Sequence, residues 1–141
     1  FPRLHELAEK DAKYDYLLEK KQMEFALKEK NCVVGTRLAV FLDVIAPKLK
    51  MEKPKFDLKV WLTAPVEVRA KRIADRDVRS MEEGLGEVVY RDSSNAERYY
   101  KLYGIDYRMP RGSLKIDNTR LNAEQTAGMI ISAAKKLSNK R

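Results

Sequence analysis

The segment from 58 to 67, Leu58-Lys59-Val60-Trp61-Leu62-Thr63-Ala64-Pro65-Val66-Glu67, has the pattern of a strand that leads directly into a helix. Its first six residues are mostly apolar or β-branched, as in strands that lie inside a sheet. Pro65 suits the first turn of a helix, and Glu67 suits the positive end of the helix dipole. The sequence therefore predicts a strand over 58–63 and a helix that runs to about Arg76.

The same alternation continues on both sides of this segment. Short β-prone runs at 31–36 and 113–117 predict two more strands. Helical spacing predicts helices over 11–30, from 87 to 104 and from 122 to 137, the last opened by a capping-box pattern. The apolar face expected on the first of these helices consists of Tyr14, Leu17, Leu18, Gln22, Phe25 and Ala26. Strands that alternate with helices predict an α/β fold, a parallel sheet flanked by helices.

The stretch between the two middle helices has mixed signals. Ser80 and Glu83 have the spacing of a capping box, but glycines follow at 84 and 86. Glycine weakens a helix, so the sequence predicts a mobile segment here and a long helix that starts only at Glu87.

Composition narrows the class of protein. The chain has 141 residues, of which 44% are hydrophobic, and this favours one folded domain over a disordered chain. Its one cysteine and an N-terminus without a signal-like apolar stretch predict a cytoplasmic protein without a membrane segment. The formal charge of +8 favours phosphorylated ligands or nucleic acid as partners.

Arginines are the candidate functional residues because a guanidinium binds phosphate in a forked geometry. Arg91, Asn95 and Arg98 are spaced to form one stripe on a helix, where two cations and an amide could hold phosphoryl oxygens. The alternative is a solvated face whose arginines pair with Asp92 or Glu97.

Two further groups of arginines fit the same chemistry. Arg37 follows the expected strand at 31–36, and ligands of α/β sheets bind beyond the carboxyl ends of strands. Arg72 and Arg76 share a helix face with Arg69 and could meet nucleotide phosphates or a base, although a plain basic surface has the same spacing.

Other side chains carry weaker signals. The tyrosines at 99, 100, 103 and 107 could stack on bases, or pack in the core with their hydroxyls at its rim. The single histidine, His5, lies near the terminus and is a poor catalytic candidate. No Cys, His, Asp or Glu set has the spacing of a zinc site, so we predict no protein-bound metal of that kind.

Several segments resemble one known family. These are 58–77 (LKVWLTAPVEVRAKRIADRD), 90–99 (YRDSSNAERY), 103–106 (YGID), 116–119 (IDNT) and the closing helix. In this order and spacing they resemble the archaeal type of cytidylate kinase, a P-loop nucleoside monophosphate kinase. The resemblance extends from about Leu7 to the C-terminus.

The resemblance implies a single nucleoside monophosphate kinase-like domain with a helical lid. Residues 1–30 would be the helical part that binds the monophosphate, 31–76 and 91–141 the core, and 77–90 the lid. It implies ATP and Mg²⁺, with CMP or dCMP phosphorylated to the diphosphate.

Roles for single residues also come from the resemblance alone. Arg37 would contact the CMP phosphate, and Asn95 would lie near the acceptor nucleotide. Arg91 and Arg98 would be the catalytic arginines that close on the phosphates. Arg72 and Arg76 would meet ATP.

The sequence departs from the family in two places. None of its six glycines lies in a Gly-x-x-x-x-Gly-Lys phosphate loop, so we expect the first strand and the P-loop to be absent from the chain as given. The family commonly has an acidic residue and a glycine before the arginine aligned with Arg37, where this chain has Gly35-Thr36, and an acidic role linked to magnesium is not carried over.

Two functions follow as expectations. The first is a kinase whose activity belongs to a longer parent protein, with this chain alone inactive. The second, from a different class, is a non-catalytic nucleotide- or RNA-binding module, which the +8 charge and the clustered arginines would also suit.

Overall fold

The computed structural model describes residues 2–140 and the side chains from Leu4 to Lys140. Its helices and strands follow each other as α1 (Pro2–Lys10), α2 (Lys13–Lys28), the 3₁₀ helix η1 (Ala39–Phe41), α3 (Leu42–Ile45), the 3₁₀ helix η2 (Ala46–Leu49), β1 (Val60–Thr63), α4 (Val66–Asp77), α5 (Met81–Tyr103), β2 (Leu114–Asp117) and α6 (Ala123–Asn139). The order of helices and strands is that of an α/β protein, as the sequence predicts.

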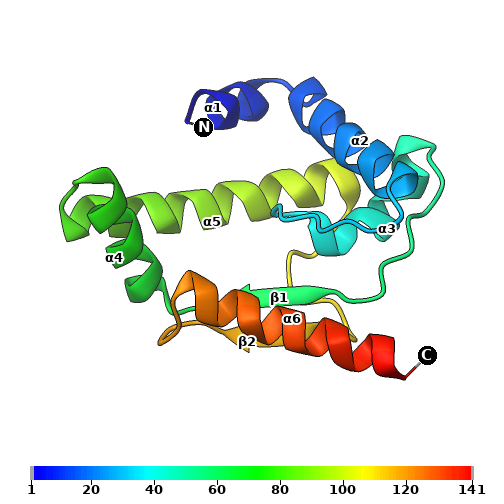
Figure 1. The fold of residues 1–141 in the computed structure, drawn as a ribbon. Helices are drawn as coiled ribbons and strands as arrows, with labels where there is room; N and C mark the ends of the chain where they lie inside the picture. Colours follow the sequence, from blue (N-terminus) through cyan, green and yellow to red (C-terminus); the bar gives the residue numbers. More distant parts are fainter. Residues whose placement is uncertain (1, 141) are drawn as a thin grey trace.

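The long helix α5 runs across the middle of the molecule (Figure 1). On one side of it lie α1 and α2, and on the other side lie the two strands with α6. At its N-terminal end α4 folds back against it. Helix α5 is therefore the element to which both halves of the structure attach.

The sheet consists of β1 and β2, which pair in parallel with Val60 opposite Leu114 and Thr63 opposite Asp117. Both strands were predicted to within two residues. The amide of Leu114 donates to the carbonyl of Lys59 at 2.8 Å, and the amide of Asn118 donates to that of Thr63 at 3.0 Å. The backbone pairing thus includes Lys59, just before β1, and Asn118, just after β2.

The strand expected at 31–36 does not form, and this prediction was wrong. A strand must exchange backbone hydrogen bonds with a neighbour, and within residues 2–140 β1 and β2 pair only with each other. Val33 is 90% exposed, whereas its neighbour Val34 is partly buried and packs against the edge of the core. Arg37 consequently follows a loop instead of a strand.

The core lies where η1, α3 and η2 meet the C-terminal half of α5. Its buried cluster consists of Met23, Leu38, Val40, Phe41, Leu42, Ile45, Ala46, Tyr99, Tyr103 and Ile105. Phe41, Trp61, Tyr99 and Tyr107 pack ring against ring beside it. Tyr99 and Tyr103 are buried whereas Tyr100 is exposed, which matches core packing and not an open stacking surface.

Helix α2 turns an unexpected face inward. Its buried residues are Asp15, Glu19 and Met23, which are spaced by four and lie on one face. Leu17 and Phe25, which were predicted to be part of the buried face, are 56% and 47% exposed. The prediction failed because α5 presents polar partners to α2, so carboxylates occupy the contact.

Helix α5 begins at Met81, six residues before the predicted start. The hydroxyl of Ser80 caps it by accepting from the amide of Glu83 at 3.1 Å. Gly84 lies inside the helix and lets α4 approach closely, because a Cβ built on it would stand 2.5 Å from the carbonyl oxygen of Ala70. This glycine serves helix packing.

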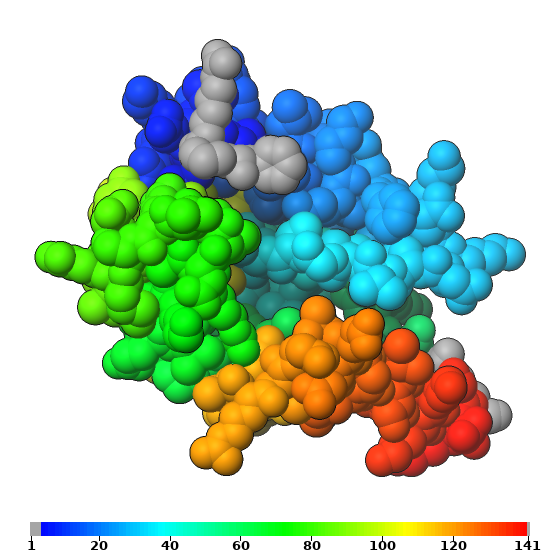
Figure 2. Space-filling model, turned by 60° about the vertical axis from the view of Figure 1, so that its left-hand side comes forward, coloured from blue at the N-terminus to red at the C-terminus, as the bar shows by residue number. Residues whose placement is uncertain are grey.

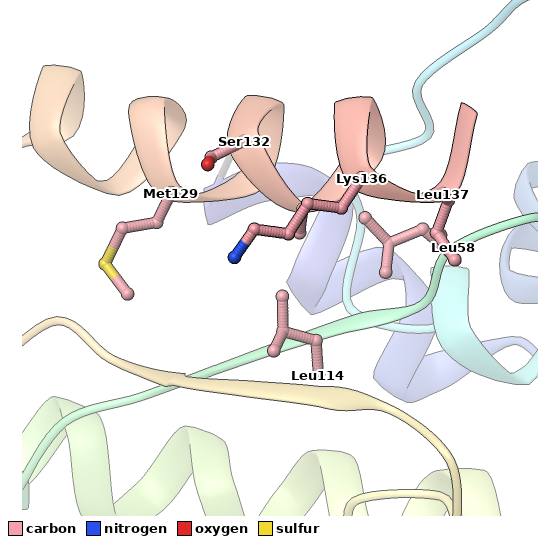
Figure 3. Close-up of a pocket in the computed structure, with 7 residues that line it drawn as sticks. Leu58, Leu114, Met129, Ser132, Lys136 and Leu137 are labelled. Atoms are coloured by element: carbon pink, nitrogen blue, oxygen red, sulfur yellow. The ribbon is translucent and has the colours of Figure 1, made fainter. Parts of the chain in front are cut away.

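Helix α6 covers the sheet incompletely. It opens with the predicted capping box between Asn122 and Gln125. Between α6 and the strands remains a pocket of about 460 Å³, into which the side chain of Lys136 extends (Figure 3). Leu58 and Leu114 line its other side.

Among the residues that the structure describes, no helix is both long and apolar enough to span a bilayer.

The two glycines of α5 give a matched test of the α4–α5 contact. Gly84→Ala places a methyl group against the backbone of Ala70, and overpacking of this kind costs about 1–3 kcal/mol. Gly86→Ala meets nothing within 4 Å and should stabilise the helix by about 0.5–1 kcal/mol. We expect opposite shifts of the unfolding free energy in urea denaturation, and equal shifts would contradict this packing.

Candidate functional site

The stripe predicted on α5 exists and faces inward. Asn95 is buried, the Arg98 side chain is almost buried, and that of Arg91 is about three-quarters buried. Seen as a space-filling surface, the molecule is hollowed between α1, the α4–α5 hairpin and α6 (Figure 2). The stripe is therefore not a solvated face, and its arginines pair with neither Asp92 nor Glu97.

Arg98 lies at the centre of the arrangement. Its Nε donates to Oδ2 of Asp15 on α2 at 2.8 Å, and its guanidinium lies 5.2 Å from the ring centre of Tyr99. Among the residues that the structure describes, neither its buried Nη1 nor the buried Oδ1 of Asn95 has a hydrogen-bond partner. Buried polar groups are rarely left unsatisfied, so each of these atoms marks a place for a polar ligand or water.

Arg37 joins this group from the loop that precedes η1. Its backbone oxygen accepts from the hydroxyl of Tyr107 at 2.9 Å, which holds the loop against the core. Burial raises the pKa of Tyr99, and the nearby charge of Arg37 opposes that rise. The same charge acts on Asp15 and His5, so Arg37 and Arg98 share one environment.

Helix α1 contributes Glu9, which the sequence analysis did not single out, and His5, which it judged a poor catalytic candidate. Glu9 Oε1 accepts from the hydroxyls of Ser94 at 2.6 Å and Tyr90 at 2.8 Å, and these bonds lower the pKa of Glu9. His5 lies within 3.1 Å of the same oxygen and packs edge-on against Tyr90. Burial lowers the pKa of His5, which favours the neutral imidazole.

Asp15 and Glu19 are the second pair that sequence reasoning missed. They lie one turn apart on α2 and are 4% and 3% exposed. The Tyr103 hydroxyl donates to Glu19 Oε2 at 3.1 Å. Burial raises the pKa of the Glu19 carboxyl to about 7, and the charge of Asp15 contributes to the rise. The sequence signal for this pair was its four-residue spacing, but that spacing is also typical of an ordinary solvent-exposed polar face.

Arg91 and Arg76 lie nearer the α4–α5 turn, each beside a carboxylate. Glu87 Oε1 is 2.7 Å from Nη2 of Arg91, and its other oxygen contacts Arg79. Asp77 pairs with the exposed Arg76 at 2.8 Å. These arginines are thus partly neutralised in the structure.

Arg72 is separate from the Arg98 group. Its guanidinium donates to Oδ1 of Asn118 at 3.0 Å and to the Asn118 carbonyl at 2.6 Å, just past the end of β2. The structure therefore places Arg37 and Arg98 around the same groups, with Asn95 about one turn before Arg98 on α5, and holds Arg72 at the carboxyl edge of the sheet. Ligands of parallel sheets bind at that edge.

Metal-binding groups do not assemble in the part of the chain that the structure describes. No three side chains of His, Cys, Asp or Glu lie close enough together there to hold an ion. Magnesium in phosphoryl transfer is bound largely by phosphates and water, so the ion expected from the resemblance would need few protein ligands.

The raised pKa of Glu19 predicts a pH-dependent stability. Since this pKa lies above the unfolded value, Glu19 stabilises the fold most below pH 4.5 and loses that contribution as the pH rises to about 7. Glu19→Gln keeps an acceptor for Tyr103 without a titration. From pH 5 to pH 8 the variant should gain about 1–3 kcal/mol in unfolding free energy relative to the wild type.

Glu24→Gln is the control for this measurement. Glu24 lies on the exposed side of α2 and pairs only loosely with Lys21, at 3.8 Å. Urea denaturation at several pH values should give Glu24→Gln a curve parallel to that of the wild type. A Glu19→Gln curve that is also parallel would show that the carboxyl is not perturbed.

Comparisons with known proteins identify the family of the chain. The model of the cytidylate kinase-like family matches residues 4–113. Cytidylate kinase from Pyrococcus abyssi is 35% identical over 127 residues, which are 89% of this chain and 64% of that protein. The enzyme from Pyrococcus horikoshii is 39% identical over 99 residues, 70% of this chain and 46% of that protein.

A third cytidylate kinase, from Methanococcoides burtonii, is 35% identical over 115 residues, covering 81% of this chain and 59% of that protein. The chain thus spans about half to two thirds of the length of these relatives. No solved structure matches it. The family match covers both α1, which carries His5 and Glu9, and the α5 stripe. By this match, the chain belongs to the cytidylate kinase-like family.

Proposed function

We propose that the protein is a nucleoside monophosphate kinase that transfers the γ-phosphoryl group of ATP to CMP or dCMP. The observation that carries the proposal is the buried polar group on α5, in which Arg98 Nη1 and Asn95 Oδ1 have no partner. Phosphate oxygens of a nucleotide would accept a hydrogen bond from Arg98 Nη1, and a hydroxyl or amino group of the nucleotide would donate one to Asn95 Oδ1. The names of the relatives support cytidine as the nucleoside.

The roles proposed for the arginines are those that the resemblance implies. Arg37 and Arg98 bind the acceptor phosphate, and Asn95 binds the acceptor nucleotide. Arg91 stabilises the charge that develops on the transferred group. Phosphoryl transfer needs this combination of positioning and charge neutralisation because the transition state spreads negative charge over several oxygens.

Arg72 and Arg76 are proposed to meet ATP. Both lie on α4, and Arg72 lies beside the residues that follow β2. An acceptor phosphate oxygen attacks the γ-phosphorus, the bond to the β–γ bridging oxygen breaks, and ADP leaves. Magnesium supplies charge neutralisation on the ATP phosphates when it is bound.

The segments carry the roles assigned from the resemblance. Residues 1–30 bind the monophosphate, 77–90 form the lid, and the remainder belongs to the core. In the structure 77–90 is the turn between α4 and α5 and the first part of α5. Closure would bring Arg91 and Arg76 to the phosphates as their carboxylate partners release them.

A kinase assay with the complete protein tests this proposal. ATP and CMP should give ADP and CDP, and Arg98→Ala should lower kcat/KM by about 100-fold or more, the usual effect of removing a transition-state donor. Arg108→Ala is the matched control, because Arg108 is exposed and pairs only with Asp106. No transfer to any monophosphate, or an unaffected Arg98→Ala, would contradict the proposal.

We further infer that residues 1–141 alone do not transfer phosphate, because no glycine lies in a phosphate-loop pattern that could hold ATP. The chain alone should show less than about 1% of the complete protein's rate per molecule. A comparable rate in the same coupled assay would show that ATP is held in another way.

RNA binding is the other outcome that the +8 charge allows. It predicts an affinity for RNA that falls steeply with salt and no CDP formation. The structure favours the kinase, since Arg69, Arg76, Arg91 and Arg98 are each paired with a carboxylate and do not form an open basic surface.

A further inference from the structure

Helix α2 directs two buried carboxylates at α5, and the proposed chemistry uses neither of them. Asp15 and Glu19 lie on the same face of the helix, opposite Arg98 and Tyr103. Burying a charge costs several kcal/mol unless it is paired and hydrogen-bonded. Apolar side chains at these two positions would pack without that cost. We therefore expect the two acidic residues to have a role beyond holding the helices together.

The bond between Asp15 and Arg98 is directional. Asp15 takes the Nε edge of the guanidinium at 2.8 Å, while Nη1 is buried and has no partner. The Tyr99 ring lies against the same guanidinium. One edge of the planar group is therefore fixed by a carboxylate and its face by an aromatic ring, which leaves a terminal nitrogen for a ligand.

We propose that Asp15 is a positioning residue, which holds Arg98 so that its Nη1 meets the phosphate of the acceptor nucleotide. This rests on the proposed function, in which Arg98 binds that phosphate. A long arginine side chain loses rotamer freedom when it binds a ligand, and a side chain that is already fixed does not lose it again. Asp15 therefore acts on affinity through Arg98, without touching the nucleotide.

Glu19 keeps the negative charge of the pair on Asp15. The groups that face Asp15 are Arg98 of α5, Arg37 of the loop before η1, His5 of α1 and Glu19 of its own helix. Arg98 contacts Asp15 directly, whereas Glu19 accepts from the neutral Tyr103 hydroxyl. Burial raises the pKa of both carboxyls, to about 7 at Glu19, whereas the charge and the hydrogen bond of Arg98 oppose the rise at Asp15. A proton taken up by the pair therefore goes first to Glu19, and Asp15 is the carboxyl that Arg98 keeps ionised.

Titration calorimetry with CMP and with cytidine separates positioning from simple stabilisation. In the complete protein, Asp15→Asn should weaken CMP binding by about tenfold or more, the usual effect of losing a charge-assisted contact, and leave cytidine binding within about twofold. Loosening of α2 as a whole would weaken both ligands equally, and that result would overturn the proposal.

A double-mutant cycle tests whether Asp15 acts through Arg98. Once Arg98→Ala has removed the guanidinium, adding Asp15→Asn should cause no further loss of CMP affinity. A further loss of the full size would show that Asp15 acts independently, against the proposal. Asp106→Asn, the same chemical change at an exposed residue outside the segment assigned to monophosphate binding, should leave CMP binding unchanged.

A measurement on the wild type covers the case in which Asp15→Asn does not fold. The Nε–H of Arg98 should give a slowly exchanging ¹⁵N signal that persists when CMP is added, since Asp15 retains that edge. Loss of the signal on adding CMP would mean that Arg98 leaves Asp15, and would overturn the proposal. A wild type that binds no monophosphate would overturn the proposed function, whereas normal binding by Asp15→Asn overturns this inference alone.

Discussion

The contact between α2 and α5 is the constraint on which the rest of the structure depends. It joins Asp15 to Arg98 and Glu19 to Tyr103; the two carboxylates and Tyr103 are buried, and the Arg98 side chain is 12% exposed. Leaving this guanidinium without its carboxylate would cost several kcal/mol. Rotation of α2 about its axis, or a slide of α2 along α5, would break the pair and is therefore strongly disfavoured. The register of the two helices fixes where the α5 stripe faces, and with it the place of Asn95.

Charge pairing along α5 explains why a chain of formal charge +8 does not present one basic surface. Asp15 of α2 pairs with Arg98, Glu87 pairs with both Arg79 and Arg91, and Asp92 pairs with Arg69 of α4. Exposed pairs of this kind are worth little in stability and exchange readily for a stronger anion. The buried pair at Arg98 is different, because its carboxylate has no route to solvent and must stay in place.

Much of the fold could be predicted from the sequence, and the failures share a cause. The strands 58–63 and 113–117 and the cap of α6 carry local signals that the structure confirms. Cys32 to Val34 has the local signal of a strand, but pairing is decided by neighbours, and none is present in 2–140. The buried face of α2 was misjudged because its partner on α5 is polar. His5 and Asp15 had no local signal, since they gain their surroundings only when α1 and α2 meet α5.

The parallel pairing of β1 with β2 also has a consequence for the order of folding. Val60 and Leu114 become neighbours only after the chain between them has made the whole α4–α5 hairpin. Closing so long a loop is entropically costly, whereas the hairpin forms from residues close in sequence and is held by the contact at Gly84. Helices α4 and α5 should hence assemble early on the ribosome, and β1 and β2 should pair after them, as β2 emerges.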